Sequence, residues 1–123
     1  MPAVRHKRHY TLEQARALRP WVAERVRRLA EAQTRLVALG ERAEPAGGGS
    51  YPGREAAQPL VELSLAVSEL EAVDIVVRDV ESGLVDFPSL RDGEEVYLCW
   101  LVGEEEIAFW HHLDAGFAGR RPL

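Results

Sequence analysis

Residues whose types and spacing could support nucleophilic chemistry lie in the last third of the chain. Cys99, His112 and Asp86 occur on three successive predicted strands, at positions that share one face of a sheet. Tyr97 stands beside them on the same face. A thiolate with a base and an orienting acid is the arrangement that nucleophilic catalysis requires. A single cysteine within a strand is more often a small buried hydrophobic residue, so both interpretations of this face stay open.

A second set of candidate residues lies where the last predicted strand runs into the C-terminal tail. We expect an enzyme site, if there is one, to collect four of them: Asp86, His111, Asp114 and Arg120. A site for a small-molecule ligand would instead be bordered by Trp110, Arg120 and Asp86. Arg120 would form a structural ion pair with Asp86 or Asp114, or hold an anionic ligand.

A metal site is the third chemical possibility in this region. His112 with Asp86 or Asp114 would supply two or three ligands, without the CxxC or HExxH spacing of well-defined sites. A di-iron bundle would need histidines on its helices, and the predicted helices contain none. The sequence shows no evident cofactor, and a divalent metal at His112 and Asp114 stays a hypothesis.

Composition limits the kind of protein that carries these residues. The 123 residues suffice for one domain, and a content of 46% hydrophobic and 28% charged residues is typical of a globular chain. The formal net charge of −5 argues against nucleic acid as a partner. We interpret the basic cluster at 5–9 as the solvated part of a mobile N-terminus over 1–10. The single cysteine, and the lack of a signal peptide or an apolar membrane segment, favour a cytoplasmic protein.

Two amphipathic helices must position the candidate residues. Residues 11–43 and 55–74 carry apolar residues three and four apart, which predicts a helix over each range. Thr11 and Gln14 have the spacing of a capping box at the start of the first helix. The residues 44–54 between them are rich in glycine and proline and are expected to form a flexible connector.

The second half of the chain is predicted to form a β-meander over 75–114, followed by a tail over 115–123. Apolar residues alternate there, and Asp92-Gly93 is a strong signal for a two-residue hairpin. That turn places Phe87 opposite Leu98. Residues 75–80 could be the first strand or the end of the second helix.

A second turn, placed at Glu104-Glu105, sets the register of the last strand. It puts Leu98 opposite His111, so that His111 faces the helices with the apolar residues. Trp110 and His112 then lie with Asp86 on the other face of the sheet, which is mixed and partly open.

The chain also carries specific motifs that cover nearly its whole length: YTLEQA at 10–15, GLVDFPSL at 83–90, VYLCW at 96–100, EEIAFWH at 105–111 and AGFAGR at 115–120. These motifs resemble a bacterial family catalogued only as domain of unknown function 2203. The resemblance implies no established activity, and it implies these characteristic positions: Asp86, Phe87, Pro88, Trp100, Trp110, His111, Gly116, Gly119 and Arg120. Because relatives would carry acidic or variable residues at 112, it favours His111 over His112.

Together these patterns predict a single α+β domain, with a long antiparallel helical hairpin packed on one face of a three- or four-stranded antiparallel β-meander. Two functions fit it. The first is a non-enzymatic interaction or small-ligand-binding module, a homodimer through the helical hairpin because Trp21 and Leu65 need partners. The alternative is a small enzyme, with a metal or without one, whose site lies near the end of the last strand and the tail.

Overall fold

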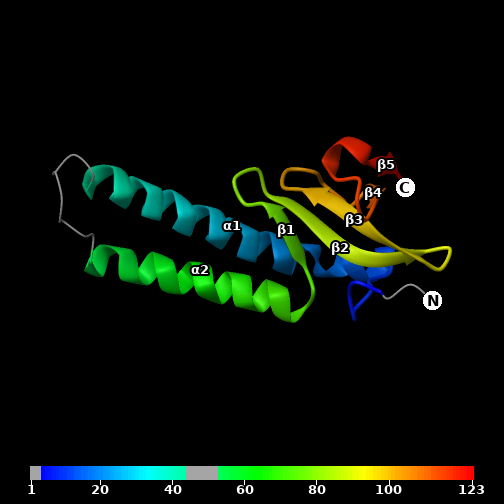
Figure 1. Ribbon diagram of the computed structural model, residues 1–123, viewed down its shortest axis with the longest axis horizontal. Helices are drawn as coiled ribbons and strands as arrows, with labels where there is room; N and C mark the ends of the chain where they lie inside the picture. The colour runs from blue at the N-terminus through cyan, green and yellow to red at the C-terminus, as the bar shows by residue number, and fades with distance from the viewer. Residues whose placement is uncertain (1–3, 44–52) are drawn as a thin grey trace.

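The computed structural model describes residues 4–43 and 53–123, and it has an α+β fold (Figure 1). Two long helices form a hairpin beside one antiparallel sheet. The elements are α1 (Leu12–Ala43), α2 (Arg54–Ala72), β1 (Val76–Asp79), β2 (Leu84–Arg91), β3 (Glu94–Leu101), β4 (Phe109–His112), the 3-10 turn η2 (Phe117–Gly119) and β5 (Arg121–Pro122). The predicted fold class is therefore confirmed. The predicted connector lies mostly outside the described residues.

The ends of the helices follow local hydrogen bonds. At the start of α1, the Thr11 amide donates to Oε1 of Gln14, and the Gln14 amide donates to Oγ1 of Thr11, which confirms the capping box. Helix α2 ends at Ala72 because Asp74 adopts a positive φ of 61° and the Ile75 amide returns to the Leu70 carbonyl. The next residues are therefore free to form β1, which settles the ambiguity at 75–80.

The five strands follow one another in sheet order, β1-β2-β3-β4-β5. This is one strand more than expected, because the last residues Arg121 and Pro122 return beside β4. The first hairpin has the predicted register, with Phe87 opposite Leu98. Asp92 and Gly93 both have positive φ, at 52° and 81°, as a tight two-residue turn requires.

The predicted register of β4 is wrong by one residue. Leu98 stands opposite Trp110, and Tyr97 stands opposite His111. The connection is the longer segment 102–108 rather than a two-residue loop, and it is held by Glu104, whose carboxylate accepts from the Leu101 amide. Because side chains alternate along a strand, this shift exchanges the faces of the β4 residues. Trp110 faces the helices, and His111 lies on the opposite face.

The helical hairpin packs on one face of the sheet (Figure 1). The core joins apolar residues of that face to the helices: Val85, Phe87, Leu98, Trp100 and Trp110 with Val22, Val26, Leu29, Ala66 and Leu70. In Figure 1 the hairpin runs well past the sheet, so the described end of α1 and start of α2 lie side by side beyond it. The sheet covers the other parts of the two helices but does not reach these two described ends.

The opposite face of the sheet was predicted to be partly open, but its central residues are buried. Asp86, Tyr97 and Cys99 are each at most 1% exposed. Part of the cover comes from the N-terminal segment, because the Arg5 and His6 amides both donate to the Glu95 carboxylate, and the His6 ring lies 2.6 Å from the Tyr97 hydroxyl. The basic cluster at 5–9 is therefore attached to β3 through these bonds, rather than being a wholly solvated segment.

Candidate functional site

Asp86 is the centre of the candidate site. Its side chain on β2 is fully buried, and both of its oxygens are occupied. Oδ1 lies 2.9 Å from Nε2 of His111, and Oδ2 accepts from Nε of Arg78 at 2.7 Å. A buried carboxylate needs such partners because leaving it unpaired in the interior is costly. The site therefore holds one negative charge between two basic side chains.

The orientation of the His111 ring follows from its two neighbours. Nδ1 lies 2.7 Å from the backbone carbonyl of His112, and because a carbonyl only accepts, Nδ1 carries the proton of that bond. Nε2 of the ring is thereby left facing Oδ1 of the Asp86 carboxylate. In its neutral form, the same ring turns the Nε2 lone pair toward Asp86.

Cys99 completes the group from β3, where it stands directly opposite Asp86. Burial, and after it the negative charge of Asp86, raises the pKa of the Cys99 thiol to about 12. The charge of Arg120 acts in the opposite direction but does not outweigh these two causes, so the thiol stays protonated and is a poor nucleophile. The interpretation of Cys99 as a small packed residue is therefore favoured over that of a catalytic nucleophile.

His112 was predicted to share the face of Cys99, and this prediction is wrong. His112 stands opposite Val96 and is exposed on the helical side of the sheet, where its ring lies 5.0 Å from that of Trp110. His111 takes the place on the Cys99 face instead. Within residues 4–43 and 53–123, one group of three potential metal ligands is present: Asp86, Cys99 and His111, with their donor atoms all within 4.8 Å of one another.

The other predicted site residues do not join this group. Arg120 donates from Nη2 to Oε1 of Glu104 at 2.6 Å and to the Cys99 carbonyl at 3.3 Å. Its ion pair is thus with Glu104, where Asp86 or Asp114 was expected, and its guanidinium lies over the ring of Phe109. Asp114 is exposed and contacts Arg5 at 3.5 Å.

Trp110 is also misplaced by the predicted register. It is only 8% exposed and belongs to the core beneath the helices. Two arginines lie over its ring, Arg91 at 4.4 Å and Arg121 at 5.7 Å from the ring centre. It packs as a core aromatic residue rather than at the edge of a pocket beside Asp86.

Two residues near the site were missed in the sequence. Arg78, which pairs with Asp86, lies in the segment whose strand or helix character was undecided, so its face was not predictable. Glu95 shares its face with Tyr97 and Cys99 by simple alternation, and that signal was available. Burial alone would raise the pKa of Glu95, but the hydrogen bonds from the Arg5 and His6 amides and from His9 lower it to about 2.

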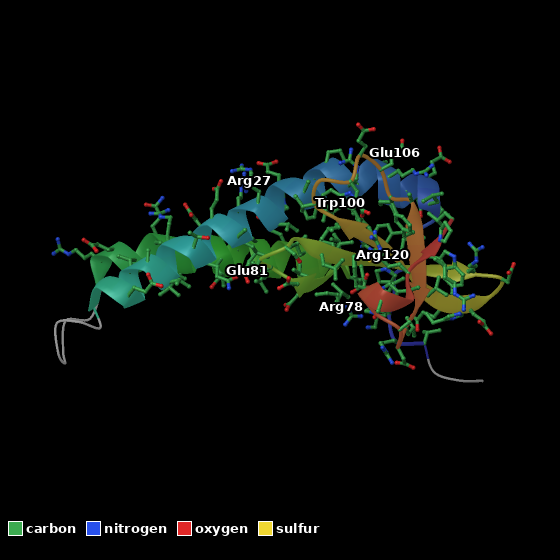
Figure 2. All side chains as sticks on the ribbon, turned by 90° about the horizontal axis from the view of Figure 1, so that it is seen from above. Arg27, Arg78, Glu81, Trp100, Glu106 and Arg120 are labelled. Carbon is green, nitrogen blue, oxygen red and sulfur yellow. The ribbon has the colours of Figure 1, made fainter. Side chains whose placement is uncertain are left out.

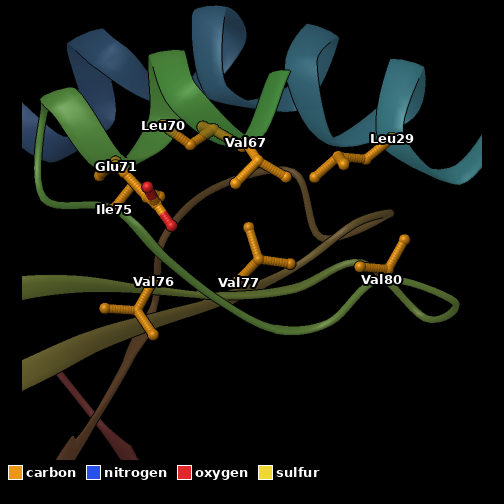
Figure 3. Close-up of a pocket in the computed structure, with 8 residues that line it drawn as sticks. All are labelled: Leu29, Val67, Leu70, Glu71, Ile75, Val76, Val77 and Val80. Atoms are coloured by element: carbon orange, nitrogen blue, oxygen red, sulfur yellow. The ribbon is translucent and has the colours of Figure 1, made fainter. Parts of the chain in front are cut away.

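An apolar hollow of about 400 Å³ lies elsewhere, between the helices and the β1–β2 hairpin (Figure 3). Val77 and Val80 point toward the helices. Val67 and Leu29, on the helices, face these two valines. Among the described residues that line it, Glu71 is the one that carries a charge. The hollow is built almost wholly from aliphatic side chains, so it could accept an apolar group.

Comparison with known proteins agrees with the motifs of the sequence. A family model described as an uncharacterized conserved protein, DUF2203, matches residues 8–123. The chain belongs to the DUF2203 family. Searches of curated proteins and of solved structures returned no match. Over the described residues, no helix of this family member is long and apolar enough to cross a membrane. Membership of the family supplies no activity, so function must be argued from the residues themselves.

Proposed function

We propose that the protein is a non-enzymatic interaction module that pairs with a second copy of itself through α2. The observation that carries this proposal is the character of the exposed face of α2. Seven of its residues lie within about 100° of arc, at 100° per residue, and one of them, Arg54 in the first turn, is charged. The other six are uncharged: Ala57, Val61, Ser64, Leu65, Ser68 and Ala72. Val61 and Leu65 are each 56% exposed.

Apart from Arg54 at the N-terminal end, the charged residues of α2 lie outside this face. Glu62 and Glu69 turn toward α1, where they pair with Arg35 at 3.5 Å and Arg25 at 2.6 Å. The exposed face of α1 is different in kind, because it carries ion pairs such as Arg28–Glu24. Figure 2 shows Arg27 of α1 pointing away from the hairpin. The contrast makes α2, and not α1, the surface suited to contact another protein.

The α2 face fits a second copy of itself by size. A two-fold axis between Ser64 and Leu65 would run the two α2 helices antiparallel, with Val61 of each copy opposite Ser68 of the other. Large side chains then meet small ones, which lets helices pack closely. Ala57 and Ala72 keep the two ends equally narrow, and the antiparallel helix dipoles attract. The fit therefore favours self-association over an unrelated partner.

Burial of the Asp86 group supports the non-enzymatic part of the proposal. Asp86 and Cys99 are fully buried and His111 is 1% exposed, so a substrate would have to displace the segments that cover them. The Cys99 thiol is protonated at neutral pH. Of the residues expected at an enzyme site, Asp114 and Arg120 pair with other partners.

The mass of the protein in solution tests the proposal. Sedimentation or light scattering across the micromolar range should return a dimer for the unchanged chain. Leu65→Lys places a charge in the centre of the interface and should give a monomer, because a buried unpaired charge is costly. Val37→Lys is the matched control, since Val37 is a similarly exposed aliphatic residue, 53% exposed, on α1. A monomer mass for the unchanged chain would overturn the proposal.

A further inference from the structure

From the Asp86, Cys99 and His111 group, we infer a binding site for one divalent transition-metal ion of the Zn²⁺ class. The three residues come from β2, β3 and β4, which are neighbours in the sheet. Their donor atoms lie within 4.8 Å of one another, whereas ligands that share a tetrahedral zinc ion stand about 3.3 to 3.8 Å apart. Small side-chain rotations close that difference.

The ligand types select the class of metal. Thiolate, imidazole and carboxylate together suit Zn²⁺ and Co²⁺, whereas Ca²⁺ and Mg²⁺ prefer oxygen ligands alone. One thiolate and one carboxylate balance the charge of a divalent ion when the imidazole is neutral, and Arg78 beside Asp86 adds one further positive charge to the group. Three protein ligands leave one tetrahedral position for a small exogenous ligand.

Each ligand is also held by a second residue, as metal ligands in proteins usually are. The Nδ1–H of His111 donates to the His112 carbonyl, which turns Nε2 toward the group. Arg78 holds Oδ2 of Asp86 and leaves Oδ1 on the side of His111. Arg120 donates to the backbone carbonyl of Cys99. The first two contacts orient the donor atoms of His111 and Asp86, and the third holds the backbone of Cys99.

Binding exchanges a proton for the metal ion. The Cys99 thiol releases its proton to the solvent, and its sulfur then coordinates the ion together with Nε2 of the neutral His111 ring and Oδ1 of Asp86. No electron is transferred in this step. The site goes beyond the proposed self-association, because it lies on the face of the sheet turned away from the helices.

Cobalt binding tests the inference directly. Co²⁺ added to chelator-treated protein should bind one ion per chain and give a thiolate-to-cobalt charge-transfer absorption band. Cys99 is the only cysteine of the chain, so the band can arise from no other residue. Zn²⁺ should abolish the band by displacement. Absence of the band in the unchanged protein would overturn the inference.

Two variants locate the ion. His111→Asn should lower the Zn²⁺ affinity by about 100-fold or more, measured by competition with a chromophoric chelator. His112→Asn, which changes the adjacent exposed histidine, should leave the affinity unchanged. Loss of binding in His112→Asn alone would place the ion on the surface and overturn the site. If His111→Asn does not fold, the cobalt spectrum of the unchanged protein still decides. Both measurements are independent of whether the protein is a dimer.

Discussion

The Nε2 atom of His111 lies 2.9 Å from Oδ1 of Asp86, and this contact joins β4 to β2 across the intervening strand β3. The two residues are 25 positions apart in the chain, and both are buried. Arg78 from β1 holds the second oxygen of the same carboxylate. One buried acid thus links β1 and β4, which lie on opposite sides of the β2–β3 hairpin.

His111→Ala should therefore destabilise the fold. The change removes one of the two side chains that bind the buried Asp86 carboxylate and leaves a cavity, so the free energy of unfolding should fall by about 3 kcal/mol. Urea unfolding followed by tryptophan fluorescence measures this directly. His112→Ala is the control and should change the free energy by under about 0.5 kcal/mol, since its side chain is exposed and its carbonyl is retained. Equal effects of the two changes would refute the buried pair.

Glu95 should make stability depend on acid pH. Its pKa is lowered from 4.5 to about 2 in the folded protein, so its contribution is fully present above pH 4.5 and is lost as the pH falls toward 2. Glu95→Gln should be less stable than the unchanged protein at pH 7, and the difference should shrink across that window. Urea midpoints at a series of pH values test this. Glu94→Gln, at an exposed neighbour, should show no such convergence.

Arg120→Ala should cost about 2 kcal/mol of unfolding free energy, although the residue sits in the C-terminal tail. The change removes the ion pair with Glu104, the bond to the Cys99 carbonyl and the contact with Phe109. Arg120→Lys should recover part of the loss, because an ammonium keeps the charge but not the planar contacts. Arg121→Ala, at the exposed neighbouring residue, is the control, and thermal unfolding of the variants is compared. A full recovery by lysine would show that charge alone matters.

The parts of the fold with local signals were predictable. The Asp92-Gly93 turn requires positive φ at two residues, and that requirement set the register of β2 and β3 correctly. The segment 102–108 has no such signal, because its shape depends on Glu104 bonding to the Leu101 amide and to Arg120. A one-residue error there reversed the faces of Trp110 and His111. The register of β4 therefore depended in part on the contact between Glu104 and Arg120, which are 16 residues apart in the chain.

The candidate site was predictable only in part. Asp86 and Cys99 were placed together by alternation, but their partner depended on the register of β4. Arg78 was hidden by the ambiguity between helix and strand, which Asp74 resolves through its positive φ. The attachment of Arg5 to the Glu95 carboxylate uses a backbone amide, which leaves no mark on residue type.

A cysteine at Ser64 gives the most direct test of self-association through α2. In the antiparallel pair, Ser64 of each copy lies beside the two-fold axis, so Ser64→Cys should form a disulfide between two chains under mild oxidation. Thr34→Cys, on the exposed face of α1, is the matched control and should stay single. Cys99 is buried and should not contribute. A covalent dimer of the Ser64 variant alone on a non-reducing gel is the result we predict. Equal or no cross-linking of the two variants would contradict the account.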